Sequence, residues 1–151
     1  MSRIRRILHP SDFSPASGNA FSRAVEMAKA NRAELIIVHG WSPVMPIAGH
    51  GYIPPKAYDE MVAAVRADGN KHLVALVAKA KKAGARARGL LLEGVPFEVI
   101  TRAAKAQRAD LVVIGTHGRT GLAKFFMGSV AQRVVGMSPC PVMTVRGRTG
   151  A

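Results

Sequence analysis

The chain has 151 residues, of which 48% are hydrophobic, and this length and composition predict a single domain over residues 1–151 around one core. Its apolar runs are much shorter than the roughly 20 residues that cross a bilayer, and its start lacks the pattern of a secretory signal, so we expect a cytoplasmic protein with no membrane partner. The 22 Lys and Arg residues exceed the 9 Asp and Glu residues and give a formal net charge of +13, which favours anionic partners.

Basic residues gather in two runs, one at Arg3, Arg5 and Arg6 and the other between Lys79 and Arg88. Neither run is interleaved with the aromatic residues on which nucleic-acid bases stack. The pattern indicates solvated surface and argues against a nucleic-acid partner. A basic protein that binds some polyanion through its surface stays open as an alternative.

The first half of the chain alternates apolar runs with one helical pattern. The runs Arg5 to His9 and Glu34 to His39 predict buried parallel strands. Between them, apolar residues recur at helical spacing from a start near Ser14 or Ser17 to an end near Asn31. Trp41 to Pro55 carries four prolines and no sustained period, which predicts a long surface loop over one end of the sheet.

The second half continues the alternation of helices and strands. A long amphipathic helix is predicted from Tyr58 until Gly84 ends it. The strand that follows carries Arg86 and Arg88 among small residues, which is typical of a sheet edge. The elements after Gly84 are predicted as strand Ala85 to Leu92, helix Val95 to Gln107, strand Leu111 to Gly115, helix Ser129 to Met137 and strand Pro141 to Val145.

This alternation predicts an α/β fold of the doubly wound type, with five strands in a mostly parallel sheet and helices on both faces. Ligands of such sheets bind beyond the carboxyl ends of the strands, where the strand order reverses. The loops after the first and fourth strands, Pro10 to Ser14 and Gly115 to Ser129, are therefore the candidate binding loops.

The second of these loops has the features of a phosphate site. Gly115 and Gly118, close behind a buried strand, would let the backbone turn sharply and bring bare N–H groups to an anion. A helix that begins at Gly128 and Ser129 presents further N–H groups and the positive end of its dipole. Taken singly, each feature has a structural alternative, since Ser129 alone could be an N-cap. His117 could contact a phosphate or brace the loop, and Arg119 and Lys124 could add charge or face water.

The complete pattern is more specific than its parts. Gly-x-x-Gly, nine residues and then Gly-Ser, present as Gly115, Gly118, Gly128 and Ser129, resembles the phosphate loop of the universal stress proteins that bind ATP. The resemblance covers essentially the full chain. Its other landmarks are Ile7-Leu8-His9-Pro10-Ser11-Asp12-Phe13-Ser14, Val38-His39 and Ser138-Pro139-Cys140-Pro141-Val142.

The resemblance implies a Rossmann-like sheet with strand order 3-2-1-4-5 that binds ATP or a related adenine nucleotide, carried with Mg²⁺ or Mn²⁺. It places Asp12 near the ribose and the metal-bound phosphates, where a role as a helix N-cap is compatible with binding, and it places the main chain of Val38 at the adenine edge. The other nucleotide contacts that it implies are Pro10, Ile114, Gly115, Gly118, Arg119, Gly128, Ser129 and Val130.

The resemblance also implies a homodimer that forms through the last strand, Pro141 to Val145, and a role as a nucleotide-dependent regulator or sensor of stress with an unknown protein partner. The usual NTPase, dinucleotide and hydrolase motifs are absent from the sequence. Asp12, His117, Arg119 and Lys124 have no evident catalytic partners, so we expect slow ATP hydrolysis at most. A dimeric scaffold that binds no nucleotide is a further alternative.

Overall fold

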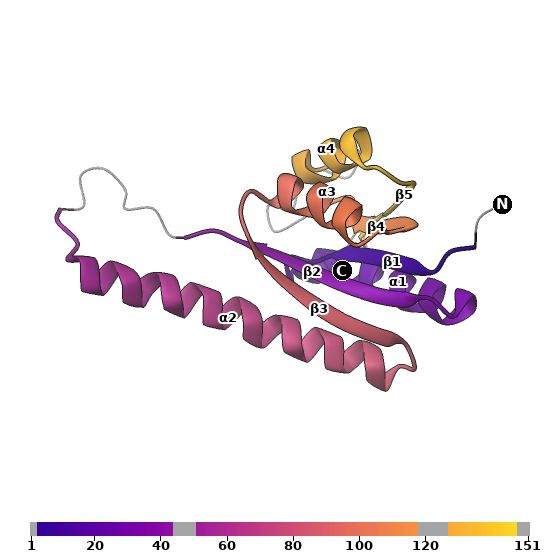
Figure 1. The fold of residues 1–151 in the computed structure, drawn as a ribbon, viewed down its shortest axis with the longest axis horizontal. Coiled ribbons are helices and arrows are strands. Elements are labelled where there is room, and N and C mark those ends of the chain that lie inside the picture. The colour runs from indigo at the N-terminus through magenta and orange to yellow at the C-terminus, as the bar shows by residue number, and fades with distance from the viewer. Residues whose placement is uncertain (1–2, 44–50, 118–126, 148–151) are drawn as a thin grey trace.

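A computed structural model describes residues 3–43, 51–117 and 127–147 of the chain (Figure 1). Gly118, Arg119 and Lys124 lie outside the described residues, as does the centre of the segment that was expected to form the 41–55 loop. None of the helices in the described ranges is long and apolar enough to cross a membrane.

The described strands form one sheet in which every neighbouring pair is parallel. Their order is β3-β2-β1-β4-β5, which confirms the predicted doubly wound fold and its strand order. β3 lies at one edge, as the charge pattern around Arg86 and Arg88 predicted. The strands are β1 (Arg6–Pro10), β2 (Glu34–Trp41), β3 (Arg86–Glu93), β4 (Leu111–Gly115) and β5 (Val142–Val145).

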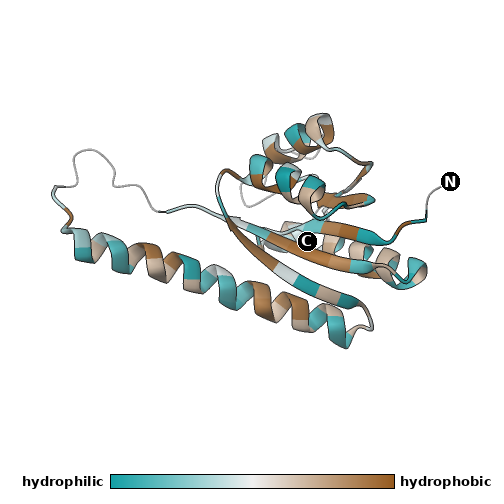
Figure 2. Cartoon of the chain, in the orientation of Figure 1, coloured by the Kyte–Doolittle hydropathy of each residue, from teal (hydrophilic) through white to brown (hydrophobic). Residues whose placement is uncertain are grey.

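Helices cover both faces of the sheet (Figure 1). α1 and α2 pack on one face with Phe21 and Leu73 in that core, and α3 and α4 pack on the other with Val99 and Val134 in a second core. Hydrophobic residues therefore run along the central strands between the two layers (Figure 2). The helices are α1 (Gly18–Asn31), α2 (Pro55–Lys82), α3 (Pro96–Ala106) and α4 (Ser129–Met137), and a 3-10 turn at Pro15–Ser17 precedes α1.

The predicted loop of residues 41–55 is shorter at both of its ends. β2 continues through Trp41, whose carbonyl accepts the N–H of Gly94 at 2.9 Å, and burial of the indole offsets the cost of ordering this residue. α2 begins at Pro55, because proline fits the first helical turn, where no intrahelical N–H bond is required. The long helix thus starts three residues before its first predicted apolar position, Tyr58.

A gap between β1 and β4 opens the crevice of this doubly wound sheet. The ladder between the two strands pairs Ile7 with Leu111 and Leu8 with Val112 and then stops. In this register the nitrogen of Pro10 would be the next donor to β4, and proline has no N–H. The carbonyl of Val113 is instead bonded to the Nδ1 atom of His9 at 2.9 Å. Proline at this position therefore releases β1 from β4 where a ligand crevice is expected.

Candidate functional site

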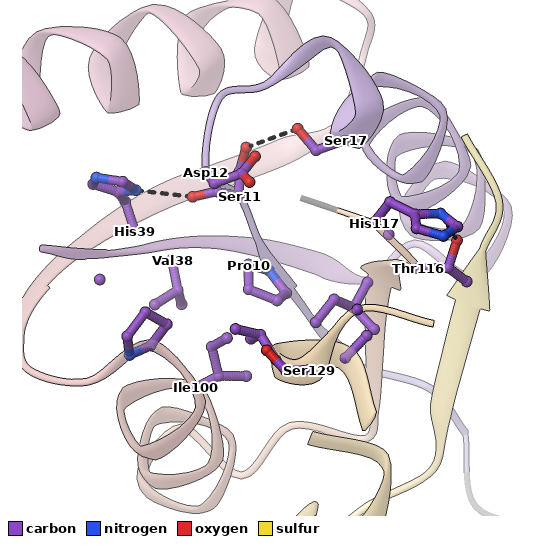
Figure 3. A pocket seen from close by; sticks show the side chains of 17 residues that line it. Pro10, Ser11, Asp12, Ser17, Val38, His39, Ile100, Thr116, His117 and Ser129 are labelled. Carbon is purple, nitrogen blue, oxygen red and sulfur yellow. Dashed lines mark hydrogen bonds between the residues drawn. The ribbon is translucent and has the colours of Figure 1, made fainter. Parts of the chain in front are cut away.

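The carboxyl ends of β1, β2 and β4 and the start of α4 surround a cavity of about 280 Å³ (Figure 3). The structure brings together every predicted site residue that it describes. Gly118 and Arg119 were predicted for the same site and lie outside the described residues. The predicted residues that line the cavity are Pro10, Asp12, Val38, Ile114, Gly115, Gly128, Ser129 and Val130.

The turn after β1 is fixed by its own side chains. The N–H of Ser14 donates to Oδ1 of Asp12 at 2.9 Å, and the N–H of Phe13 donates to Oγ of Ser11 at 3.1 Å. Phe13 has a φ of 63°, a left-handed conformation that costs a non-glycine residue on the order of 1 kcal/mol. Asp12 is thus the anchor of an Asx turn at the rim of the cavity, and the N-cap of the following turn is Ser14.

Contacts between aromatic rings hold this turn against β2 and α2. The Phe13 ring lies 4.3 Å from the His39 ring and 5.3 Å from the His72 ring, measured between centroids. Nδ1 of His39 is bonded to the carbonyl of Ser11 at 2.8 Å (Figure 3). Gly69 of α2 faces the same imidazole, since a Cβ there would come within 3.2 Å of it. The glycine that interrupts the α2 stripe therefore makes room for a cavity-lining histidine.

The start of α4 is tied to the end of β4. The N–H of Gly128 donates to the carbonyl of Thr116 at 2.6 Å, and a Cβ on Gly128 would lie only 3.1 Å from that oxygen. Gln132 makes the first intrahelical bond, to the carbonyl of Gly128, so the first N–H groups of α4 have no acceptor within the helix. Those of Ser129, Val130 and Ala131 belong to cavity-lining residues and suit an anion.

The cavity has an apolar side and a polar side (Figure 3). Val38, Ile100 and Ile114 belong to the apolar side, whereas Ser11, Asp12, Ser17, Thr116, His117 and Ser129 supply polar groups. Oγ1 of Thr116 and Nδ1 of His117 are 3.0 Å apart and hydrogen-bonded. Among the described lining residues Asp12 is the only carboxylate, and none is Lys or Arg. Without a cationic side chain among the described lining residues, backbone N–H groups together with hydroxyl and imidazole groups are the donors available to an anion here.

Several lining residues were not predicted from the sequence. Pro96 and Ile100 come from α3, and only the three-dimensional fold places that helix over the cavity. Gly40 lies on β2 directly after His39, the last residue of the predicted strand. Thr116 could have been found, because it directly follows the predicted phosphate-loop strand. The other unpredicted lining residues are Ser11, Ser17, His39 and Ala131.

The chain is similar to one known protein family along nearly its whole length. The family model described as "Universal stress protein family" matches residues 3–146. The curated universal stress protein YxiE of Bacillus subtilis is 34% identical over 147 residues, which cover 95% of this chain and 99% of that protein.

Solved structures that resemble the chain include two of proteins with a nucleotide bound. A universal stress protein in complex with cAMP matches with a TM-score of 0.65 and 26% identity over 97% of this chain and all of that one. A universal stress protein family protein from Arabidopsis thaliana with AMP bound matches with a TM-score of 0.69 and 22% identity over 96% of this chain and 93% of that one.

Proposed function

The chain belongs to the universal stress protein family, and we propose that it binds ATP or a related adenine nucleotide, carried with Mg²⁺ or Mn²⁺, as a nucleotide-dependent regulator of the stress response. The observation that carries the proposal is the convergence on one cavity of the first-strand motif, the end of β2 and the Gly128-Ser129 helix start. Structural neighbours with cAMP or AMP bound support the same ligand class.

The apolar side of the cavity is the proposed adenine slot. The resemblance assigned the adenine edge to the main chain of Val38, whose carbonyl already accepts the N–H of Ser11 at 2.9 Å. Alternate residues of β2 bond to β1, and the peptide groups of Gly40 face that side beyond the end of β1 at Pro10. Gly40 thus presents a main-chain donor and acceptor at the cavity, and we propose that it shares or takes the adenine contact.

The phosphates are proposed to lie at the start of α4. A triphosphate needs several N–H donors and a positive potential, and the first turn of a helix supplies both. Gly128, Ser129 and Val130 line the cavity at this place. Asp12 would approach the phosphates through a nucleotide-bound metal, because a bare carboxylate repels them.

We expect Asp12→Asn to separate the metal role of Asp12 from its structural one. Asparagine keeps an oxygen that accepts the Ser14 N–H, so the turn should persist, but the negative charge is gone. Calorimetric titration should give about tenfold weaker binding of ATP with Mg²⁺, and equal or tighter binding of ATP in a chelator, where the charge only repels.

Equal loss of affinity with and without metal would show that Asp12 does not act through a metal. The broader proposal is tested first by acid extraction of purified protein, chromatography for adenine nucleotides, and titration of ATP with Mg²⁺ into the wild type. Absence of saturable binding to well-folded wild-type protein would overturn the nucleotide proposal and favour a scaffold.

Slow hydrolysis is the catalytic activity that we propose to test. Phosphoryl transfer needs charge that stabilises the transition state and a group that orients water. Of the described lining residues, Asp12 and His117 are the candidates for orienting a water molecule. The described lining contains no Lys or Arg that could stabilise the charge of the transition state. Phosphate release at catalytic protein concentration that is lost in Asp12→Ala would establish an ATPase, whereas its absence would leave a binding protein.

A homodimer is proposed to form through the outer edge of β5. Within the described part of the sheet β5 pairs with β4 alone. The carbonyls of Pro141 and Val145 accept N–H groups from the β4 side, so the peptide groups of Thr144, on the alternate position, face away from β4. Thr144→Pro should remove an outer N–H without breaking the sheet, because proline is tolerated on the solvent side of an edge strand.

We expect sedimentation to show a dimer for the wild type and a monomer for Thr144→Pro at the same concentration, with unchanged circular dichroism. Thr144→Val is the matched control, because it changes the side chain and keeps the N–H. A Thr144→Pro protein that stays dimeric would place the dimer contact elsewhere.

A further inference from the structure

Five arginines line a second concavity, which lies at the opposite end of the strands from the nucleotide cavity. We call this concavity the arginine basin. Its volume is about 370 Å³ and its lining consists of Arg3, Arg5, Arg6, Arg32, Glu34 and Arg86. Hydrophilic residues mark this end of β1 and β3 in Figure 2, near the N-terminus marked in Figure 1. The nucleotide cavity lies beyond the carboxyl ends of the strands, whereas the arginine basin lies at their amino ends.

The backbone under the arginine basin is held in place. Arg6, Glu34 and Arg86 are in register on three neighbouring strands, which lie about 4.8 Å apart in a sheet. The N–H groups of Arg5 and Arg6 donate to the Asp110 carboxylate at 2.8 and 3.0 Å. The basin therefore has a fixed floor, although its arginine side chains are exposed.

Two carboxylates lie near the five arginines, Glu34 in the lining and Asp110 beside it, where Asp110 accepts the main-chain N–H groups of Arg5 and Arg6. Glu34, the carboxylate in the lining, is already paired with Arg88, with 3.1 Å between Nε and Oε1. None of the five lining arginines forms an ion pair with another described residue. The guanidinium of Arg86 instead donates to the main-chain carbonyl of Arg32 at 2.9 Å, which ties this side chain to the end of α1. The five arginines place like charges around one concavity, and a multivalent anion would reduce the repulsion between them.

Charge at helix ends does not explain the cluster. Basic side chains near helix C-termini stabilise the helix dipole, and Arg32 at the end of α1 fits that role. Arg5, Arg6 and Arg86 lie instead at or just before the starts of strands, where no such dipole exists. Arg86 also suits its place on the edge strand β3, but an edge position does not account for Arg5 and Arg6 at the start of β1.

We propose that the arginine basin binds a multivalent inorganic phosphate chain of the oligophosphate class. Guanidinium groups match phosphate oxygens in bidentate geometry, and several of them within one Debye length, about 8 Å at physiological salt, act together. The described lining contains no aromatic residue on which a base could stack, which argues against a nucleotide or a single-stranded nucleic acid. The concavity is open to solvent, and its volume of about 370 Å³ suits a compact anion of a few phosphate groups.

The test is calorimetric titration of inorganic tripolyphosphate, without divalent metal and at low ionic strength, into the full chain. Three proteins are compared with the wild type. Arg5→Gln/Arg6→Gln/Arg86→Gln removes basin charge from exposed side chains and leaves the backbone bonds to Asp110. Lys56→Gln/Arg66→Gln/Lys71→Gln removes the same charge from three exposed positions on α2. Gly128→Val perturbs the phosphate end of the nucleotide cavity.

We expect the dissociation constant to rise about tenfold in the basin variant, and less than about twofold in the α2 variant and in Gly128→Val. Equal losses in the basin and α2 variants would mean that net charge alone attracts the anion. Loss confined to Gly128→Val would assign the anion to the nucleotide cavity. Absence of tripolyphosphate binding to the wild type would overturn the proposal. Duplex DNA is titrated in the same way, and the proposal would also be overturned if DNA bound more tightly than tripolyphosphate and lost affinity in the same basin variant.

Discussion

Acidification from about pH 6.5 to about pH 4 is expected to lower the free energy of unfolding by about 3 kcal/mol through His9 alone. The His9 side chain is fully buried, and burial lowers its pKa from 6.5 to about 4, although the bond to the Val113 carbonyl partly opposes that shift. The unfolded chain binds this proton below pH 6.5, whereas the native protein binds it only below about pH 4. The unfolded state therefore gains protons first, and stability falls throughout that window.

The geometry of His9 explains why the neutral ring is favoured. A carbonyl only accepts, so the bond to Val113 requires the proton on Nδ1. The Nε2 atom is buried without a hydrogen-bond partner among the described residues. Protonation would place a second N–H, and a charge, in that apolar position beside Phe21, whose ring centroid lies 6.0 Å away. The neutral Nδ1–H tautomer is the form that the fold accommodates.

Other groups also titrate in this range, so the measurement is a difference between two proteins. Urea unfolding of the wild type and of His9→Asn is followed at a series of pH values. Asparagine can still donate to the Val113 carbonyl, and it does not titrate. The stability of the wild type relative to this variant should fall by about 3 kcal/mol between pH 6.5 and pH 4. A relative stability that is independent of pH would contradict the burial argument.

The strands and helices could be predicted because their patterns are local. The buried residues Leu35 to Val38 form a continuous apolar run, which is the pattern of a strand covered on both faces. α4 spans the predicted residues 129–137, because an apolar side and a start at Gly128 and Ser129 are both visible in the sequence. The end of β2 was missed for the opposite reason. Trp41 is ordered by a bond to Gly94, a residue far along the chain.

The loops that line the candidate site were predictable from the sequence, whereas the tertiary contacts that hold those loops in place were not. Asp12 and Gly128 belong to short motifs whose spacing is readable from the chain. The contacts of the Phe13 ring with the His39 and His72 rings join the turn after β1 to β2 and α2. Because these segments are far apart in the sequence, no local pattern predicts the contacts. Gly115 shows the reverse error: it was expected to permit a sharp turn, but its φ is not left-handed and a Cβ there would make ordinary contacts of 3.5 Å or more. Its position at the end of β4, not its flexibility, places it at the cavity.

Gly128→Val is expected to weaken ATP binding about a hundredfold while the protein stays folded. A Cβ at this position would lie 3.1 Å from the Thr116 carbonyl, the acceptor of the Gly128 N–H, so the start of α4 must shift or rotate. The N–H groups of the first turn would then no longer point together at the phosphates. The backbone of Gly128, with φ of −61° and ψ of 154°, is one that valine adopts readily, so we expect a stability cost within about 1 kcal/mol.

Gly136→Val on the same helix is the matched control. A Cβ at Gly136 would have no atom within 4 Å, so this variant adds the same side chain to α4 without disturbing the cavity. Calorimetry with ATP and Mg²⁺ should give wild-type affinity for Gly136→Val. Wild-type affinity for Gly128→Val as well, in a protein with normal thermal unfolding, would show that the phosphates do not bind at the start of α4. Because the adenine slot lies apart from Gly128, AMP should lose less affinity than ATP in Gly128→Val, and this ratio separates a displaced phosphate site from a collapsed cavity.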